Sequence, residues 1–196
     1  MKKYLVDRAI SEIKPDDDLL ILTIASAIVA SLGVSMGNIA VIIGSMLIAP
    51  FFDPIISLVV LMTAGEMKHV LNALRSFFLI TFTAILVSTA VFVILRLFGD
   101  IGDYSVSNLL TIEYFAIAMV LGVVGILMWI WPTSSSTTAG ISVAISLMPP
   151  LAFTAKEIVM LNWNGALSFF LLYLLNAIGI IVGGYLVVMI KGRKQN

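Results

Sequence analysis

One acidic residue, Asp53, interrupts the long uncharged part of the chain, in the segment Pro50-Phe-Phe-Asp-Pro54. If this segment crosses a bilayer, an ionised side chain there costs about 3 kcal/mol unless it faces a cavity or a partner. Asp53, Pro50 and Pro54 are therefore candidate residues of a cation or proton site. The alternative, which we favour, is that Asp53 caps a helix starting at Pro54. The two roles are compatible.

Hydroxyl side chains gather in the segment Trp131-Pro-Thr-Ser-Ser-Ser-Thr-Thr138, which precedes a second apolar run. The exposed backbone donors at a helix start attract anions, and hydroxyls cap such starts. Asn38 gives the first half of the chain a comparable polar helix start. We include these positions as candidate pathway residues: Asn38, Ser134, Ser135, Ser136 and Thr137. Ordinary turn and cap chemistry at a membrane surface is the favoured alternative.

Asn176 is a further candidate pathway residue, because it lies within an apolar helical run where an amide must find a partner. Interhelical hydrogen bonding is the favoured interpretation. On the same helix, Gly179, Gly183 and Gly184 suit close helix approach or oligomer contact. The chain has one histidine and no cysteine, and no base accompanies its serines. We therefore expect no metal, no cofactor and no enzymatic activity.

The composition is that of a membrane protein. Of the 196 residues, 61% are hydrophobic and 11% are charged, and the mean hydropathy is +1.13. A spanning helix needs about 20 apolar residues, so the chain holds about six crossings. The predicted segments are 18–33, 39–62, 71–97, 110–131, 136–154 and 166–190. Residues 18–190 thus form a single transmembrane domain of the all-α class.

The distribution of cations predicts the topology. Of the eleven lysines and arginines, only Arg96 and Lys156 fall in the segments assigned to the outer side. The positive-inside rule therefore puts both termini in the cytoplasm of a cell (inner) membrane protein. Residues 2–14 predict an amphipathic interfacial helix within the N-terminal region 1–17, and residues 191–196 form a basic tail. A net charge of zero and no basic cluster argue against nucleic-acid binding.

The two halves share a proline pattern, Gly44-Ser-Met-Leu-Ile-Ala-Pro50 and Ala144-Ile-Ser-Leu-Met-Pro-Pro150. Each predicts a broken helix, so Pro149 and Pro150 join the candidate residues. The two halves, about 18–97 and 110–190, each have the order long helix, broken helix, long helix. Three crossings repeated in tandem enter the membrane from opposite sides, which predicts an inverted repeat. The alternative is that these prolines only bend their helices and have no role in a functional site.

The same motifs resemble a prokaryotic membrane family catalogued as domain of unknown function 389. The similar segments are Ala27-Ile-Val-Ala-Ser-Leu-Gly33, Val41-Ile-Ile-Gly-Ser-Met-Leu-Ile-Ala-Pro50, Pro54-Ile55, Ala139-Gly-Ile-Ser-Val-Ala-Ile-Ser-Leu-Met-Pro-Pro-Leu-Ala152 and Leu175-Asn-Ala-Ile178. The resemblance covers about residues 18–190 and implies a polytopic membrane protein without an assigned activity. The family pattern has a small residue where this chain has Asp53, so any role of Asp53 rests on this sequence alone.

Paired broken helices in two halves of a membrane protein indicate a binding or conduction site. We therefore expect a transporter or channel for a small ion or solute, in a lipid bilayer and as a homo-oligomer. A membrane assembly or sensing module without transport is the alternative, and it requires a dry, well-packed centre. An intramembrane enzyme is the least favoured hypothesis.

Overall fold

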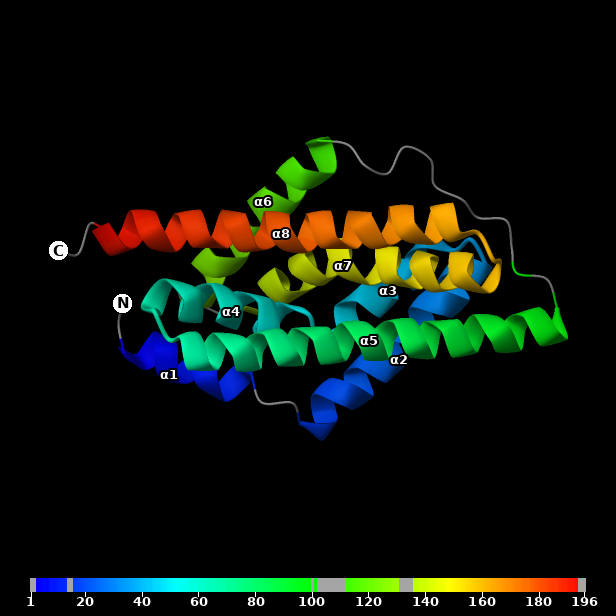
Figure 1. The fold of residues 1–196 in the computed structure, drawn as a ribbon, viewed down its shortest axis with the longest axis horizontal. Coiled ribbons are helices and arrows are strands. Elements are labelled where there is room, and N and C mark those ends of the chain that lie inside the picture. Colours follow the sequence, from blue (N-terminus) through cyan, green and yellow to red (C-terminus); the bar gives the residue numbers. More distant parts are fainter. Residues whose placement is uncertain (1–2, 14–15, 100, 102–111, 131–135, 194–196) are drawn as a thin grey trace.

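The computed structural model of the chain is helical throughout the residues that it describes. These residues are 3–13, 16–99, 101, 112–130 and 136–193, of which 136–146 and 191–193 are described by their backbone alone. Within them lie eight α-helices and no strand (Figure 1), so the expected all-α class is confirmed. The helices are α1 (Lys3–Glu12), α2 (Asp17–Ser35), α3 (Ile39–Ile48), α4 (Phe52–Ala64), α5 (Met67–Phe98), α6 (Ile112–Ile130), α7 (Ser136–Val159) and α8 (Trp163–Arg193).

Among the described residues, four helices are long and apolar enough to cross a membrane, namely α2, α5, α6 and α8. The helices α3 and α4 make a fifth candidate span when the bent pair is taken together, with 51° between them. The apolar helices support the predicted membrane location. The remaining predicted segment, 136–154, forms part of α7, and its crossing of a membrane stays a prediction.

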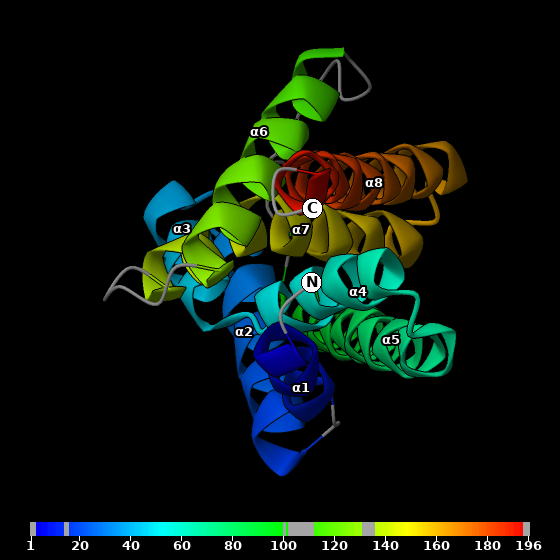
Figure 2. The ribbon, with the colours of Figure 1, turned by 90° about the vertical axis from the view of Figure 1, so that its left-hand side faces the viewer.

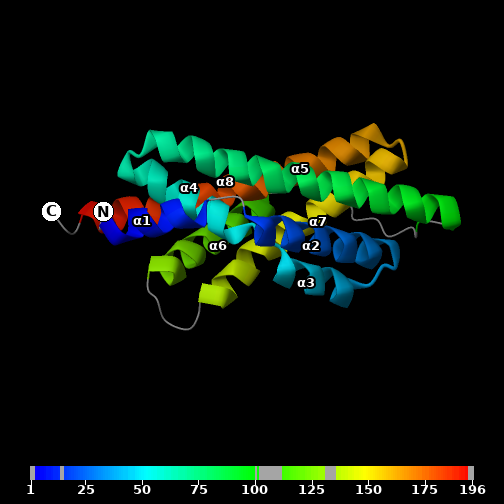
Figure 3. The same cartoon turned by 90° about the horizontal axis from the view of Figure 1, so that it is seen from below.

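The two longest helices frame the molecule. Helices α5 and α8 run in opposite directions, and α4 and α7 each contact both of them (Figure 1). The shorter spans α2 and α6 cross this layer at an angle, while α3 lies on the side of the molecule away from α5 (Figures 2 and 3). The buried core therefore lies where α4 and α7 meet the two long helices.

Pro50 interrupts the second predicted segment. Helix α3 ends at Ile48 and α4 begins at Phe52, while Ala49 between them has extended backbone with φ −66° and ψ 122°. Proline lacks the N–H that would continue the helix, and it pushes the preceding residue out of the helical region. The predicted break in the first half is therefore confirmed.

The predicted break in the second half is wrong. Helix α7 continues through Pro149 and Pro150. Proline is tolerated inside a membrane helix when neighbouring helices support the backbone. Here the flanking side chains are fully buried; they are Leu147, Met148, Leu151 and Ala152. The Thr154 hydroxyl also donates to the Pro150 carbonyl oxygen at 2.7 Å. Packing of these side chains therefore supports the helix through the proline pair, whereas the Thr154 bond lies after it, beyond the carbonyls of residues 145 and 146 that lose their N–H donors.

The α4–α5 and α7–α8 turns have the same backbone arrangement. Gly65 (φ 77°) and Leu161 (φ 59°) both adopt the left-handed conformation. In each turn the amide of this residue donates to the carbonyl three residues back, and the next amide donates to the carbonyl five residues back. This pattern closes the end of a helix by satisfying its last carbonyls. The first turn uses glycine, whereas the second forces leucine into the same conformation.

Helices α6 and α8 pack backbone to backbone through glycine. A side-chain carbon at Gly122 would overlap the carbonyl of Ile180, and one at Gly183 would overlap the carbonyl of Met119. Small residues allow such close approach where van der Waals packing holds membrane helices together. The glycines of α8 thus serve contact within the chain, which was one of the two roles expected for them.

Helix α1 forms within the segment predicted to be amphipathic, and its apolar face packs on protein. Leu5, Ala9 and Ile13 are buried, and α1 contacts α4, beside which it lies in Figure 3. The Ser76 hydroxyl of α5 donates to the Ile13 carbonyl at 2.5 Å. The helix itself is confirmed, whereas its position at a membrane interface stays a prediction.

Candidate functional site

The break between α3 and α4 leads directly to Asp53. The residue that caps α4 is Phe51, which makes no side-chain cap hydrogen bond, and Asp53 lies inside the first turn. The interpretation of Asp53 as a helix cap is therefore wrong, because α4 begins two residues earlier than a cap at Asp53 requires. Its carboxylate still faces the positive end of the α4 dipole. Pro54 also lies in this first turn, where its missing N–H costs no hydrogen bond.

Asp53 is exposed in the single chain, although its neighbours Phe52 and Pro54 are buried. Among the described residues, its carboxylate makes no hydrogen bond or ion pair. The carboxylate lies within electrostatic range of Glu12 and Arg8 on α1. An exposed acid in a spanning segment must meet water, a cation or another protein surface rather than lipid.

Aromatic side chains close the space beside the break. Phe51 is 0% exposed and packs edge-to-face on Phe77 of α5 and on Tyr173 of α8, at centroid distances of 6.5 and 6.4 Å. Phe77 and Tyr173 stack at 5.9 Å. These three rings, here called the central aromatic cluster, therefore join the first break to both long helices.

A buried hydrogen bond crosses between the long helices next to this cluster. The hydroxyls of Thr81 and Tyr173 lie 2.5 Å apart, and the Thr81 hydroxyl also donates to the Phe77 carbonyl at 2.7 Å. Tyr173 is only 1% exposed, so its hydroxyl has no access to bulk water. Because buried hydroxyls need partners, this pair fixes the separation of α5 and α8 at the centre.

The predicted site residues do not all lie in one place. Asn38 is the N-cap of α3, where its side chain accepts from the amides of Ala40 and Val41. It is exposed at the far end of α3, about 15 Å along the helix from the break. The favoured capping role of Asn38 is confirmed. Its distance from Pro50 removes it from the centre of the site.

The second-half proline segment does lie near the first break. Helix α7, which carries Pro149 and Pro150, contacts both α3 and α4. The Ser26 hydroxyl of α2 approaches the sulfur of Met148 at 4.0 Å. Asn176 is 4% exposed and lies less than one turn beyond Tyr173 on α8. The helix that carries the proline pair thus packs against both helices that flank Pro50, while Asn176 is buried close to the central aromatic cluster in sequence.

The remaining predicted residues cannot be assigned to this centre. Ser134 and Ser135 lie outside the described residues. Ser136 and Thr137 form the start of α7, but their side chains lie outside the described part of the chain. The proposed hydroxyl contribution to the pathway therefore stays a prediction.

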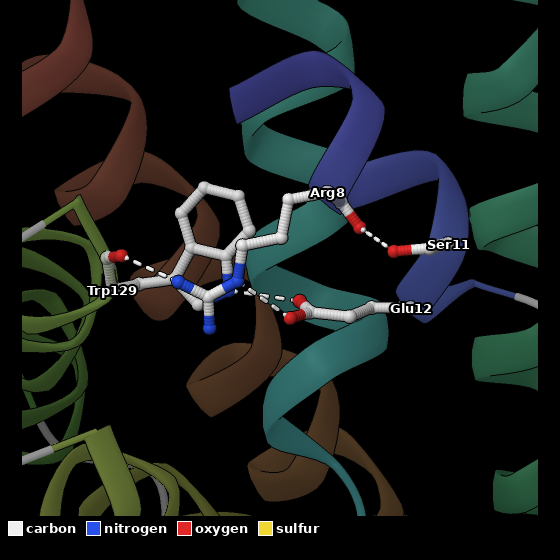
Figure 4. A network of polar contacts seen from close by, with 4 residues as sticks. All are labelled: Arg8, Ser11, Glu12 and Trp129. Carbon is white, nitrogen blue, oxygen red and sulfur yellow. Dashed lines mark hydrogen bonds and ion pairs between the residues drawn. The ribbon is translucent and has the colours of Figure 1, made fainter. Parts of the chain in front are cut away.

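One polar network was missed by the sequence analysis. Arg8 of α1 donates from Nε to Glu12 at 2.7 Å and from its terminal nitrogen to the Trp129 carbonyl at 3.0 Å. The Trp129 indole donates to Glu12 at 2.9 Å, and the guanidinium carbon lies 4.4 Å from the centre of the indole ring (Figure 4). The four-residue spacing of Arg8 and Glu12 indicates a pair, but nothing in the sequence identifies Trp129 as its partner.

Comparison with known proteins gives one family and one relative. Residues 46–182 match the sequence model of a family described as Domain of unknown function (DUF389). An uncharacterized protein of Methanocaldococcus jannaschii is 29% identical over 170 residues, which cover 82% of this chain and 50% of the relative. The chain therefore spans about half the length of that curated relative. No solved structure matches the chain significantly.

Proposed function

Because the chain belongs to the DUF389 family, as its proline motifs predicted, and that family has no assigned function, we propose a function from the geometry of the chain itself. The protein is an integral membrane protein that carries a small ion or solute through the region where the α3–α4 break meets α7. The observation that carries this proposal is the interruption at Pro50, followed within one turn by the exposed acid Asp53. Interrupted backbone at membrane depth belongs in protein or in a water-lined cavity.

The proposed architecture is an inverted repeat of two three-span units, α2 to α5 and α6 to α8. Helix α2 contacts α3 and α5, as α6 contacts α7 and α8. The turns at Gly65 and Leu161, which share one hydrogen-bond pattern, occupy equivalent positions in the two units. A rotation of 180° about an axis perpendicular to the plane of Figure 1 brings α5 approximately onto α8, and α2 approximately onto α6. These correspondences support a two-fold axis through the molecular centre.

The central aromatic cluster gives this arrangement the character of a closed state. Phe51, Phe77 and Tyr173 are each at most 6% exposed. They fill the space between the first break and the two long helices. Under the transport proposal, this cluster must separate before a solute can pass, and Asp53, two residues after Phe51, is the acidic group on the path.

The proposed topology has both termini on the cytoplasmic side of the cell membrane. Helix α1 and the final turns of α8 lie at the same end of the molecule (Figures 1 and 3). That end also carries Lys68 at the start of α5, whereas Arg96 and Lys156 lie toward the other end. The positive-inside rule then assigns the first end to the cytoplasm.

Flux through proteoliposomes tests the proposal. The purified protein would be reconstituted, and movement of H⁺, Na⁺, K⁺ and Cl⁻ would be followed with ion-sensitive dyes. We expect flux above that of protein-free vesicles, reduced in Asp53→Asn. Absence of flux of these ions and of a panel of small neutral solutes, in a sample whose helices are intact by circular dichroism, would contradict transport.

A second candidate function is a membrane assembly or sensing module that moves no solute. The observation that favours it is the dry packing of the centre, where Phe51 is 0% exposed. In that case Asp53 would lie at the contact between copies of a homo-oligomer. Asp53→Asn would then change the oligomeric state measured by light scattering in detergent, whereas the transport proposal leaves that state unchanged.

A further inference from the structure

Helix α1 is too short to be stable alone. It has 10 residues, and isolated helices below about 12–15 residues are marginal in water. Its structure therefore depends on what it contacts. Leu5, Ala9 and Ile13 form the buried part of an apolar stripe toward α4, with Val6 and Ile10 partly buried beside them. The exposed residues of the helix are Lys3, Tyr4, Asp7 and Ser11. Its attachment must come from this stripe and from a few polar contacts.

These polar contacts tie α1 to both halves of the molecule. On the first half, Ser76 of α5 donates to the carbonyl of Ile13, just beyond the end of α1. On the second half, Arg8 and Glu12 hold Trp129 at the end of α6 (Figure 4). Helix α1 is thus a bridge between α4 and α5 on one side and α6 on the other.

The contact with α6 combines a buried partner with accessible charges. Trp129 is 0% exposed, while the side chains of Arg8 and Glu12 are 34% and 23% exposed. The indole N–H and the backbone carbonyl give the charged pair two fixed partners, and the ring adds a cation–π contact. Because Arg8 and Glu12 are partly exposed, water can replace their bonds to Trp129, whereas release of the whole helix also exposes Leu5, Ala9 and Ile13.

Asp53 lies close enough to influence this contact. Its carboxylate repels Glu12 and attracts Arg8. The acid beside the break and the charged pair on α1 therefore share one electrostatic environment. A change in the charge of Asp53 would therefore alter the electrostatic potential at Arg8 and Glu12, the charged residues that attach α1.

We propose that α1 is a detachable latch, which bridges the two halves and holds them in this closed arrangement through the Arg8–Glu12–Trp129 contact. The latch opens as a unit when α6 moves away from α4 and α5. Detachment of α1 is a property of the fold, so it can be measured without any transport assay. A result that contradicts the latch can therefore be distinguished from a result that contradicts the transport proposal.

Hydrogen exchange followed by mass spectrometry, on the full chain in lipid nanodiscs, tests this latch. In the unmodified protein we expect amides of α1 to exchange faster than central amides of α5 and α8. Arg8→Ala removes both charge-assisted hydrogen bonds of the guanidinium, and should speed exchange in α1 by about tenfold or more. Arg8→Lys keeps the charge but loses the guanidinium geometry, so it should give an intermediate increase.

Ser11→Ala is the matched control. Its hydroxyl is exposed and bonds only to the Arg8 carbonyl within α1, so exchange in α1 should change less than twofold. Two results would overturn the latch. Unchanged exchange of α1 in Arg8→Ala would mean that the Trp129 contact does not hold it. Exchange of α1 only together with α5 and α8 would mean that it belongs to the cooperative core.

Discussion

At the scale of single residues, the polar groups near the centre have different surroundings. The hydroxyl of Tyr173 has a buried partner in Thr81, so its requirement for a hydrogen bond is met within the protein. Asp53 is exposed in the single chain and faces charges on α1. Tyr173 therefore belongs to the packed centre of the molecule. A substitution of Asp53 is therefore a better test of the transport proposal than a substitution of Tyr173.

Asp53→Asn keeps the size of the side chain but removes its charge. Under the transport proposal, flux of a cation or proton in proteoliposomes should fall about tenfold or more, because a charged partner contributes about 1.5–3 kcal/mol. Asp17→Asn, at an exposed first-turn acid of α2, is the control and should leave flux nearly unchanged. Equal flux in both variants would remove Asp53 from the path.

Tyr173→Phe removes the hydroxyl that joins α8 to Thr81 and keeps the ring in the central aromatic cluster. We expect a loss of about 0.5–1.5 kcal/mol, measured as a lower unfolding temperature in detergent. Tyr185→Phe, on the same helix but 37% exposed, should have no measurable effect. Equal shifts in the two variants would show that the Thr81 bond contributes nothing to stability.

The sequence identified the site residues whose roles are local and missed those that depend on distant partners. Pro50 and Asn38 act on their own helices, so their effects on the break and on the start of α3 were predictable. Trp129 contacts α1 more than a hundred positions away in the chain. Such a pair depends on the packing of α1 against α6, which a single sequence does not reveal.

At the scale of elements, similar proline segments gave different structures. Pro50 ends α3, but Pro149 and Pro150 remain inside α7. Local propensity favours a break in both places. The outcome in α7 depends on the fully buried side chains that pack around the pair. Tertiary support of this kind explains why the second break could not be predicted from the motif alone.

Glycine substitutions test the packing of these elements. Gly183→Ala places a methyl group against the backbone of Met119 and should cost about 1–3 kcal/mol by overpacking, seen as a lower unfolding temperature. Gly44→Ala in α3 meets nothing within 4 Å and should be neutral or stabilising by up to about 1 kcal/mol. The prediction fails if Gly183→Ala is tolerated as well as Gly44→Ala.

At the scale of the whole molecule, composition predicted the all-α class and the positions of five candidate spans. Runs of apolar residues decide these features, because lipid requires long helices with satisfied backbones. The arrangement of the spans was not predictable in the same way. Whether α7 crosses the membrane and how the halves face each other depend on contacts between helices.

The absence of cysteine allows the inverted repeat to be tested with single introduced thiols. Glu66 and Asn162 occupy equivalent exposed positions in the two similar turns. Under the proposed topology, Glu66 lies on the cytoplasmic side and Asn162 on the outer side. In cells, Glu66→Cys should therefore react with a membrane-impermeant maleimide only after the membrane is opened, whereas Asn162→Cys should react while the cells are intact. Labelling of both from the same side would rule out an inverted repeat.

The glycine contacts between α6 and α8 limit how this molecule can deform. With Gly122 against the Ile180 carbonyl and Gly183 against the Met119 carbonyl, neither helix can slide along or rotate about its axis without a backbone clash. The pair must therefore translate as one rigid body. We therefore expect rearrangement at residues 49–51, the non-helical segment between α3 and α4, and at the contacts of α1.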